Sequence, residues 1–301
     1  QQSAYTAYTT NLGADGVLSP SFTATAGSDF PSALGVNGLA METSKNLSLG
    51  FVFDATEEVS ITLDAYRVEI EDRITLGSML TTEDVAFNAA AVTALQTTGA
   101  DQANYFSNSV NSTTSGVDLI VTYNTDVSDG HLSVTLASNI NETEIDSVNA
   151  PTGIPSTVAL DDLQRSFLTD GQPQERATFT VDYSKDLWSA VIRANYFGET
   201  DITYFGHQHI GLPGFLSPTG SFQPTSIVES ALLIDVNFDY QLTQSLGLAF
   251  GVNNIFDKTP DELGEDEVLN FITNGAFKYP VRALPYGFDG MSYYARVNFK
   301  F

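Results

Sequence analysis

The last eleven residues of the chain, 291–301, read MSYYARVNFKF and decide the fold class. Apolar and polar side chains alternate along this stretch without interruption. The apolar set is Met291, Tyr293, Ala295, Val297, Phe299 and Phe301, and the polar set is Ser292, Tyr294, Arg296, Asn298 and Lys300. Because successive side chains of a β-strand point to opposite faces, this pattern predicts a strand with one apolar and one polar face.

The same period of two recurs along most of the chain and predicts an all-β fold. Eight further segments show it: 47–53, 59–65, 117–123, 132–136, 177–183, 188–196, 234–240 and 246–252. With the terminal segment they make about nine strands.

The connections between these strands alternate between short and long. Short turns lie at 54–57, 126–130, 185–186 and 242–245, and long segments lie at 76–113, 141–174, 198–228 and 257–290. Outer-membrane barrels alternate in this way, with short periplasmic turns and long extracellular loops. The pattern therefore predicts an antiparallel transmembrane β-barrel with a periplasmic C-terminus. After Ala65 the apolar residues change parity, which indicates a β-bulge or a strand that rises out of the bilayer.

Two sets of side chains follow from this placement. Tyr123, Tyr183 and Tyr240 each end an apolar phase just before a short turn, so they predict an aromatic girdle at the membrane interface. The polar phases predict a set that faces the lumen, either in contact with other groups there or simply hydrating it. This set is Asp118, Asp182, Arg193, Asn195, Asp235, Asn237, Asp239, Asn253, Arg296 and Asn298.

The charge and composition of the chain exclude several classes of partner. With 37 Asp and Glu against 12 Lys and Arg, the formal net charge is −25, which opposes binding to nucleic acid. There is no cysteine, so disulfides, thiolate zinc sites and cysteine nucleophiles are excluded. Charged residues make up only 16% of the chain, which fits strands that present half of their side chains to lipid.

No arrangement of residues predicts an enzyme or a bound cofactor. His131 lies at a short turn, where we expect a solvated imidazole. The acidic run DELGEDE at 261–267 offers oxygen ligands for calcium, but a hydrated surface loop explains it better.

One long loop carries the candidates for contact with a ligand. These are Tyr204, Phe205, His207 and His209, in the segment YFGHQHIGLPG. The two histidines, close to Glu199 and Asp201, are only a weak signal for a metal, because two ligands in a glycine-rich loop do not define a site.

Four motifs resemble the barrel of TonB-dependent outer-membrane receptors. Residues 41–51 (METSKNLSLGF) look like the family's Pro-Glu-x-Ser strand entry, with Met41 in place of proline, and 59–74 (VSITLDAYRVEIEDRI) look like its tyrosine-rich hairpin. Residues 108–123 (NSVNSTTSGVDLIVTY) resemble a strand start of the family, and 247–261 (GLAFGVNNIFDKTPD) resemble its Asn-Asn-Leu-Phe-Asp-Lys box. The terminal aromatic Phe301 is similar to the signal that the barrel-assembly machinery reads.

This resemblance implies a receptor that takes up a scarce nutrient across the outer membrane with energy from TonB. The family's barrel has about 22 strands and holds a plug domain. Since about nine strands and no plug are found in the sequence, the resemblance covers the C-terminal part of the barrel. Residues 1–45 are expected to form an extracellular loop or an incomplete strand, and residues 46–301 the barrel segment.

The resemblance also implies the partners. These are outer-membrane lipid, the remainder of the receptor with its plug, the TonB system, the barrel-assembly machinery and a small nutrient. Siderophore-bound iron is the family's commonest cargo, with a saccharide or cobalamin as alternatives, and the lumen-facing set would contact the plug.

Two other classes of protein stay open from the residues alone. A small outer-membrane pore or enzyme would need an even number of strands that close among themselves. A secreted acidic β-sandwich, such as a carbohydrate-binding module, would bury its apolar faces in a core and purify without detergent.

Overall fold

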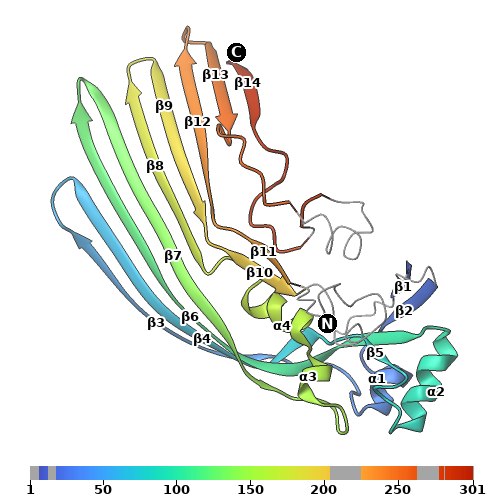
Figure 1. Cartoon of the computed structure of the whole chain (residues 1–301). Coiled ribbons are helices and arrows are strands. Elements are labelled where there is room, and N and C mark those ends of the chain that lie inside the picture. Colours follow the sequence, from blue (N-terminus) through green and yellow to red (C-terminus); the bar gives the residue numbers. More distant parts are fainter. Residues whose placement is uncertain (1–6, 13–17, 204–224, 263–277, 281, 301) are drawn as a thin grey trace, which may run out of the picture.

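The computed structural model describes residues 7–12, 18–203, 225–262, 278–280 and 282–300. Nine of its strands form one antiparallel meander, which we call the wall (Figure 1). In order across the wall they are β3 (Thr43–Asp54), β4 (Val59–Leu76), β6 (Gln102–Val127), β7 (Gly130–Val148), β8 (Glu175–Lys185), β9 (Trp188–Phe197), β12 (Ala231–Gln241), β13 (Leu246–Asn253) and β14 (Ser292–Phe299). Each predicted strand corresponds to one strand of the wall.

Four short turns connect the strands at one end of the wall, and β14 also ends there (Figure 1). We call it the turn end, and the opposite end the loop end. Ser128 and Asp129 form the β6–β7 turn with φ angles of 52° and 61°, the left-handed values that a two-residue hairpin turn requires. The four predicted short turns are thus confirmed.

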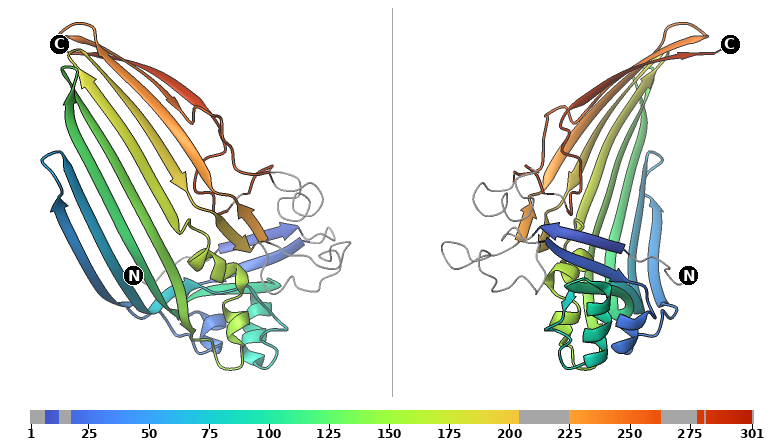
Figure 2. Two further views of the ribbon diagram at one scale, coloured as in Figure 1. Left: turned by 60° about the vertical axis from the view of Figure 1, so that its left-hand side comes forward. Right: turned by 90° about the vertical axis from the view of Figure 1, so that its right-hand side faces the viewer.

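The loop end carries a small packed unit that the sequence pattern did not predict. β2 pairs antiparallel with β1 and parallel with the first residues of β6, while β5 pairs with the same part of β6. Figure 2 shows these elements and two helices gathered at one end of the wall. They are β1 (Ala7–Leu12), β2 (Leu18–Ala24), α1 (Asp29–Ala33), β5 (Leu80–Thr81) and α2 (Ala89–Thr98).

This unit has a hydrophobic core of its own, which we call the loop-end core. Its buried residues are Phe22, Ala24, Phe30, Leu34, Leu80, Val85, Ala91, Leu95, Ala100, Ala103, Tyr105 and Ile154. Asn88 joins the two helices, because its side chain accepts hydrogen bonds from the first turn of α2 and donates one of 2.7 Å to the Ala33 carbonyl of α1.

A second group of elements lies between β7 and β12 at the same end. It consists of α3 (Ser156–Ala159), α4 (Asp162–Thr169) and the separate hairpin of β10 (Thr200–Thr203) and β11 (Thr225–Val228). The backbone N–H of Thr203 donates to Ser166 Oγ at 3.1 Å, and that of Asp201 to the Asp170 carbonyl at 3.2 Å. These bonds hold the hairpin against α4.

One expectation about the strands was wrong, and one of two alternatives is excluded. The segments 76–113 and 141–174 are not wholly loop, because β6 already begins at Gln102 and β7 continues to Val148. There is also no bulge at Ala65, since β3 and β4 pair in one register from Thr43 to Asp54; the register shifts against β6 lie later, between Ile70 and Ile74. The change of parity fits the other alternative, a strand that rises out of the bilayer, because the face that is apolar up to Leu47 turns charged beyond it, with a Lys45–Glu71 ion pair of 2.6 Å.

The two faces of the wall differ in chemistry over most of its length. On the face that we call the apolar face, Leu49 is 65% exposed, Phe51 62% and Phe250 57%. No second layer covers these side chains among the described residues. A β-sandwich would bury such a face in its core, so this arrangement argues against a secreted sandwich.

Tyrosine rings lie flat across glycines of neighbouring strands at two places on the opposite, polar face. Tyr294 crosses Gly251 and donates a hydrogen bond of 2.7 Å to Asn237 Oδ1 on the strand beyond. Tyr66 crosses Gly116 in the same way and accepts one of 3.2 Å from Asn139. Each tyrosine therefore ties three strands together, and only glycine leaves space for the ring.

Candidate functional site

The pairing register places the predicted lumen-facing residues on a single face of the wall. In one row across the sheet, Asp182 is opposite Val191, which is opposite Asn237, and Gly251 and Tyr294 complete the row. The neighbouring row contains Arg193 opposite Asp235. Because paired residues of antiparallel strands point to the same side, these residues share the polar face. The remaining candidates that the register places there are Asp118, Asn195, Asp239, Asn253, Arg296 and Asn298.

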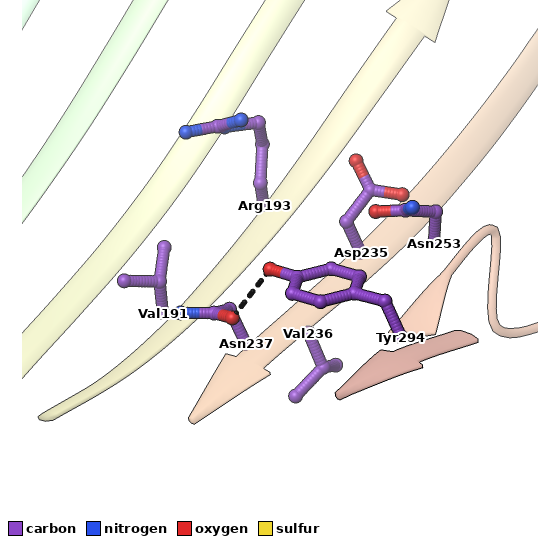
Figure 3. A pocket seen from close by; sticks show the side chains of 7 residues that line it. All are labelled: Val191, Arg193, Asp235, Val236, Asn237, Asn253 and Tyr294. Atoms are coloured by element: carbon purple, nitrogen blue, oxygen red, sulfur yellow. Dashed lines mark hydrogen bonds between the residues drawn. The ribbon is translucent and has the colours of Figure 1, made fainter. Parts of the chain in front are cut away.

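Part of this face is hollowed into a cavity of about 240 Å³ between β9, β12, β13 and β14. Figure 3 shows the residues that line it: Val191, Arg193, Asp235, Val236, Asn237, Asn253 and Tyr294. Four of the ten predicted lumen-facing residues, Arg193, Asp235, Asn237 and Asn253, therefore meet at one place. Tyr294 belongs to the polar phase of its strand but was not among the predicted lumen-facing residues. Its ring lies over Gly251 of the neighbouring strand and forms one side of the cavity.

Each carboxylate oxygen of Asp235 accepts one hydrogen bond within the protein. One carboxylate oxygen, Oδ2, accepts a hydrogen bond of 3.1 Å from Asn195 Nδ2, and the other, Oδ1, accepts one of 2.8 Å from the backbone N–H of Asn254. Arg193, its partner in register, makes no hydrogen bond or ion pair with any described residue, and Figure 3 shows its guanidinium turned away from Asp235. The site thus keeps five N–H donors free.

The other predicted residues of this face are held more loosely or elsewhere. Arg296 lies 3.9 Å from Asp239 Oδ1, which is an exposed and weak ion pair. Asn253 Nδ2 donates to Ser292 Oγ at 3.3 Å. Asn298 pairs in register with Gly247 and lies four residues beyond Tyr294 on β14, outside the lining of the cavity.

The three tyrosines predicted as a girdle lie on the apolar face near the turn end. Tyr123 pairs in register with Val134, Tyr183 with Ala190, and Tyr240 with Trp188. Around the last two, the rings of Tyr183 and Trp188 are 5.2 Å apart and those of Trp188 and Phe238 5.9 Å apart. An aromatic row thus runs across β8, β9 and β12.

The candidates for ligand contact, Tyr204, Phe205, His207 and His209, and the terminal Phe301 lie outside the described residues. Within the described ranges, no group of three or more His, Asp or Glu side chains is placed to hold a metal ion. His131 Nδ1 lies 3.1 Å from Asp126 Oδ1, with both side chains largely in solvent.

Three of the four motifs that carried the family resemblance meet at the loop end of β3, β4 and β6. Glu42 accepts a hydrogen bond of 2.5 Å from the backbone N–H of Ile74. Asn108 bonds both the N–H and the C=O of Ala40, at 2.8 and 3.1 Å, and also the carbonyl of Asp72. These bonds hold Asp72, whose φ of 55° is left-handed, at the bulge. Side chains of these motifs therefore fix the backbone, through hydrogen bonds, where the strands leave the regular sheet.

The fourth motif, NNIFDKTPD, does the same between β13 and β14. Asn254 bonds the backbone of Lys258 twice, through Nδ2 at 2.7 Å and Oδ1 at 3.0 Å. The Asp257 carboxylate accepts a bond of 2.7 Å from the backbone N–H of Met291, directly before β14. A second cavity, of about 560 Å³, opens beside this motif between residues 230–232 and 256–262.

Several loop-end groups have a raised pKa, among them Asp201 and Tyr286. Burial raises the pKa of Asp201, and the neighbouring carboxylates of Asp170 and Glu199 raise it further. One of its carboxylate oxygens, Oδ1, is buried without a hydrogen-bond partner. Burial, with a contribution from Asp261, raises the pKa of Tyr286 to about 12.

The class of protein follows from these features: an antiparallel wall with one exposed apolar face, short turns at one end and long, structured loops at the other. The sequence model described as "TonB dependent receptor-like, beta-barrel" matches residues 1–255. The chain belongs to this family of TonB-dependent receptors, which are outer-membrane transport proteins and not enzymes. No curated protein matches the chain.

Solved structures show the same fold at low sequence identity. The Escherichia coli outer-membrane transporter YddB superposes with a TM-score of 0.55 at 11% identity, over 93% of this chain and 34% of that one. The ferric enterobactin receptor PfeA of Pseudomonas aeruginosa gives 0.52 at 16%, over 98% and 37%. The pyoverdine receptor FpvA of the same organism gives 0.52 at 13%, over 86% and 30%. The chain thus spans about a third of the length of these structures.

None of the helices in the described ranges has the length and apolar character needed to cross a membrane.

Proposed function

We propose that this chain forms the C-terminal part of the wall of a receptor barrel of roughly 22 strands, which imports a scarce nutrient with energy from TonB. The observation that carries the proposal is the open wall. β3 and β14 each pair with only one neighbour among the described strands, although both edges sit beside an exposed apolar face. In lipid, such edges would leave backbone groups unsatisfied at a cost of several kcal/mol each, so further strands are needed.

Closure of the nine strands on themselves does not offer a good alternative. β3 and β14 both run from the loop end to the turn end, so they would have to pair in parallel. Transmembrane barrels of single bacterial chains close with an even number of antiparallel strands. This argues against a small autonomous pore or barrel enzyme.

The membrane placement extends this proposal. The apolar face contacts lipid, Tyr123, Tyr183 and Tyr240 form the periplasmic girdle, and the C-terminus with Phe301 lies in the periplasm for the barrel-assembly machinery. Residues 1–45 belong to an extracellular loop that precedes β3, and residues 46–301 to the barrel segment. A plug domain fills the interior, and the polar face touches it and lines the path beside it. The loop with Tyr204, Phe205, His207 and His209 takes part in ligand capture.

The cargo is proposed from the family and its neighbours. Siderophore-bound iron comes first, since PfeA is a ferric enterobactin receptor and FpvA a pyoverdine receptor. A saccharide or cobalamin is the alternative.

The function is tested by uptake in cells that carry the whole receptor. A panel of ferric siderophores, cyanocobalamin and oligosaccharides is offered to four strains, with and without the receptor and with and without TonB. We expect one cargo whose uptake needs both proteins; uptake that needs neither would contradict the proposal. Residues 1–301 expressed alone should also give no heat-modifiable band on a denaturing gel, and a folded band would show that the wall closes without other strands.

A further inference from the structure

The cavity beside Tyr294 is a binding site of a recognisable chemical class. We propose that it binds a neutral polyhydroxylated solute of the size of one sugar ring. The proposal rests on the proposed function, because it names a class of solute that meets the inner surface of the receptor. With about 240 Å³, the cavity lies just below the usual range for small-molecule pockets of about 300–1,000 Å³, which suits a single ring.

An aromatic platform forms one side of this cavity. The ring of Tyr294 lies across Gly251, and its hydroxyl is fixed by the 2.7 Å hydrogen bond to Asn237. The side of the ring that faces away from Gly251 stays open, since Tyr294 is 41% exposed. A rigid apolar surface of this kind matches the C–H face of a sugar ring at little entropic cost.

Hydrogen-bonding groups of both kinds surround the platform (Figure 3). Arg193 supplies N–H donors that no described residue uses. Asn253 donates through Nδ2 to Ser292, which leaves its amide oxygen as an acceptor. Each oxygen of Asp235 accepts one hydrogen bond and keeps further lone-pair capacity. A hydroxyl group can both donate and accept, so a polyol matches this mixture.

The charge balance selects a neutral solute. Arg193 and Asp235 cancel within the lining, Asp182 lies in the row of Val191 and Tyr294, and Asp239 in the next row is paired with Arg296 at 3.9 Å. An anion would meet the carboxylates of Asp235 and Asp182 beside one free guanidinium, and a cation would meet Arg193 at the rim. Like-charge contacts disfavour both, whereas hydroxyl groups pay no such penalty.

The experiment uses the whole receptor in a detergent without a sugar head group, because maltoside detergents would compete for the cavity. Saturation-transfer NMR is measured with glucose, galactose and mannose, and with the charged analogues glucuronate and glucosamine. We expect at least one neutral hexose to bind, and both charged analogues to bind at least tenfold more weakly. Tighter binding of glucuronate, or no binding of any neutral hexose, would overturn the proposal.

Matched variants separate binding from folding. Tyr294→Leu removes the platform, and Tyr66→Leu removes the equivalent ring over Gly116, which does not line this cavity. We expect at least a tenfold loss of hexose affinity in Tyr294→Leu and none in Tyr66→Leu. Arg193→Gln changes an exposed side chain that bonds no described residue, and it tests the site without changing the ring. We expect it to lower hexose affinity about tenfold.

The outcome is independent of the proposed transport function. If TonB-dependent uptake holds but hexose binding is absent or unchanged in Tyr294→Leu and Arg193→Gln, only the sugar site is refuted. If hexose binding depends on both residues while uptake does not require TonB, the transport function fails and the site stands.

Discussion

Substitution of Gly251 by alanine tests how the polar face is built. A Cβ at this position would lie 2.3 Å from Cε1 and 2.4 Å from Cζ of Tyr294, and these atoms belong to a ring that cannot yield without leaving its place. Displacement of the ring breaks the hydrogen bond to Asn237, which contributes about 0.5–1.5 kcal/mol. Overpacking adds about 1–3 kcal/mol. We therefore expect Gly251→Ala to lower the free energy of unfolding by roughly 2–4 kcal/mol.

The assay is guanidinium unfolding of the whole receptor in lipid vesicles, followed by the heat-modifiable band. Gly247→Ala on the same strand is the control, because its Cβ would meet only the end of the flexible Gln241 side chain, at 3.2 Å, and should cost little. A double-mutant cycle isolates the ring: in a Tyr294→Ala background, Gly251→Ala should cost less than about 0.5 kcal/mol. An equal cost in both backgrounds would refute the reasoning, since the loss would then come from the strand and not from the contact.

Three further predictions concern the two ends of the wall. Asp201→Asn should stabilise the β10–β11 hairpin at neutral pH and change nothing below the pKa of an ordinary aspartate. The reason is that a carboxyl group whose pKa is raised in the folded state makes the protein less stable as the pH rises. Amide exchange of Ile202 at pH 4 and pH 7.5 measures this, and equal protection in both proteins at pH 7.5 would contradict it. Asn108→Ala should expose the backbone N–H of Ala40 to exchange, leave the carbonyls of Ala40 and Asp72 without this donor and lower stability by about 1–3 kcal/mol, whereas Asn46→Ala, on exposed β3, should be nearly neutral. The fluorescence of Trp188 is obtained as the difference between the protein and its Trp188→Phe variant. It should be quenched more by lipids brominated near the head group than by lipids brominated at the chain ends. The reverse order would show that the turn end does not lie at the membrane interface.

The sequence by itself determined the wall. Each of its nine strands carries a period of two, and the alternation of short and long connections already ordered the strands and gave them two ends. These properties are local, because the parity of a side chain within one strand fixes its face. For the same reason the residues of the predicted polar set lie together on one face of the wall.

Some local signals at the loop end were overlooked. The segment before Gly99 reads NAAAVTALQTTG, in which Asn88 is a good N-cap and Gly99, with φ 71°, a typical C-cap. It predicts a helix, and the structure has α2 there. The helix was not predicted because the segment 76–113 was interpreted as one long loop.

Only the tertiary structure decided which polar residues act together. The parallel pairing of β2 with β6 joins residues about 80 positions apart, and no local pattern encodes it. Tyr294 borders a cavity because Gly251 on the next strand leaves room for its ring and Asn237 on the strand beyond accepts its hydroxyl. Arg193 bonds no described residue, although Asp235 is its partner in register, and the Asp235 carboxylate is bonded instead by Asn195 and Asn254. The position of a residue within its own strand decides which face its side chain occupies. Its neighbours on that face depend on the register between paired strands, which is set by contacts between the strands.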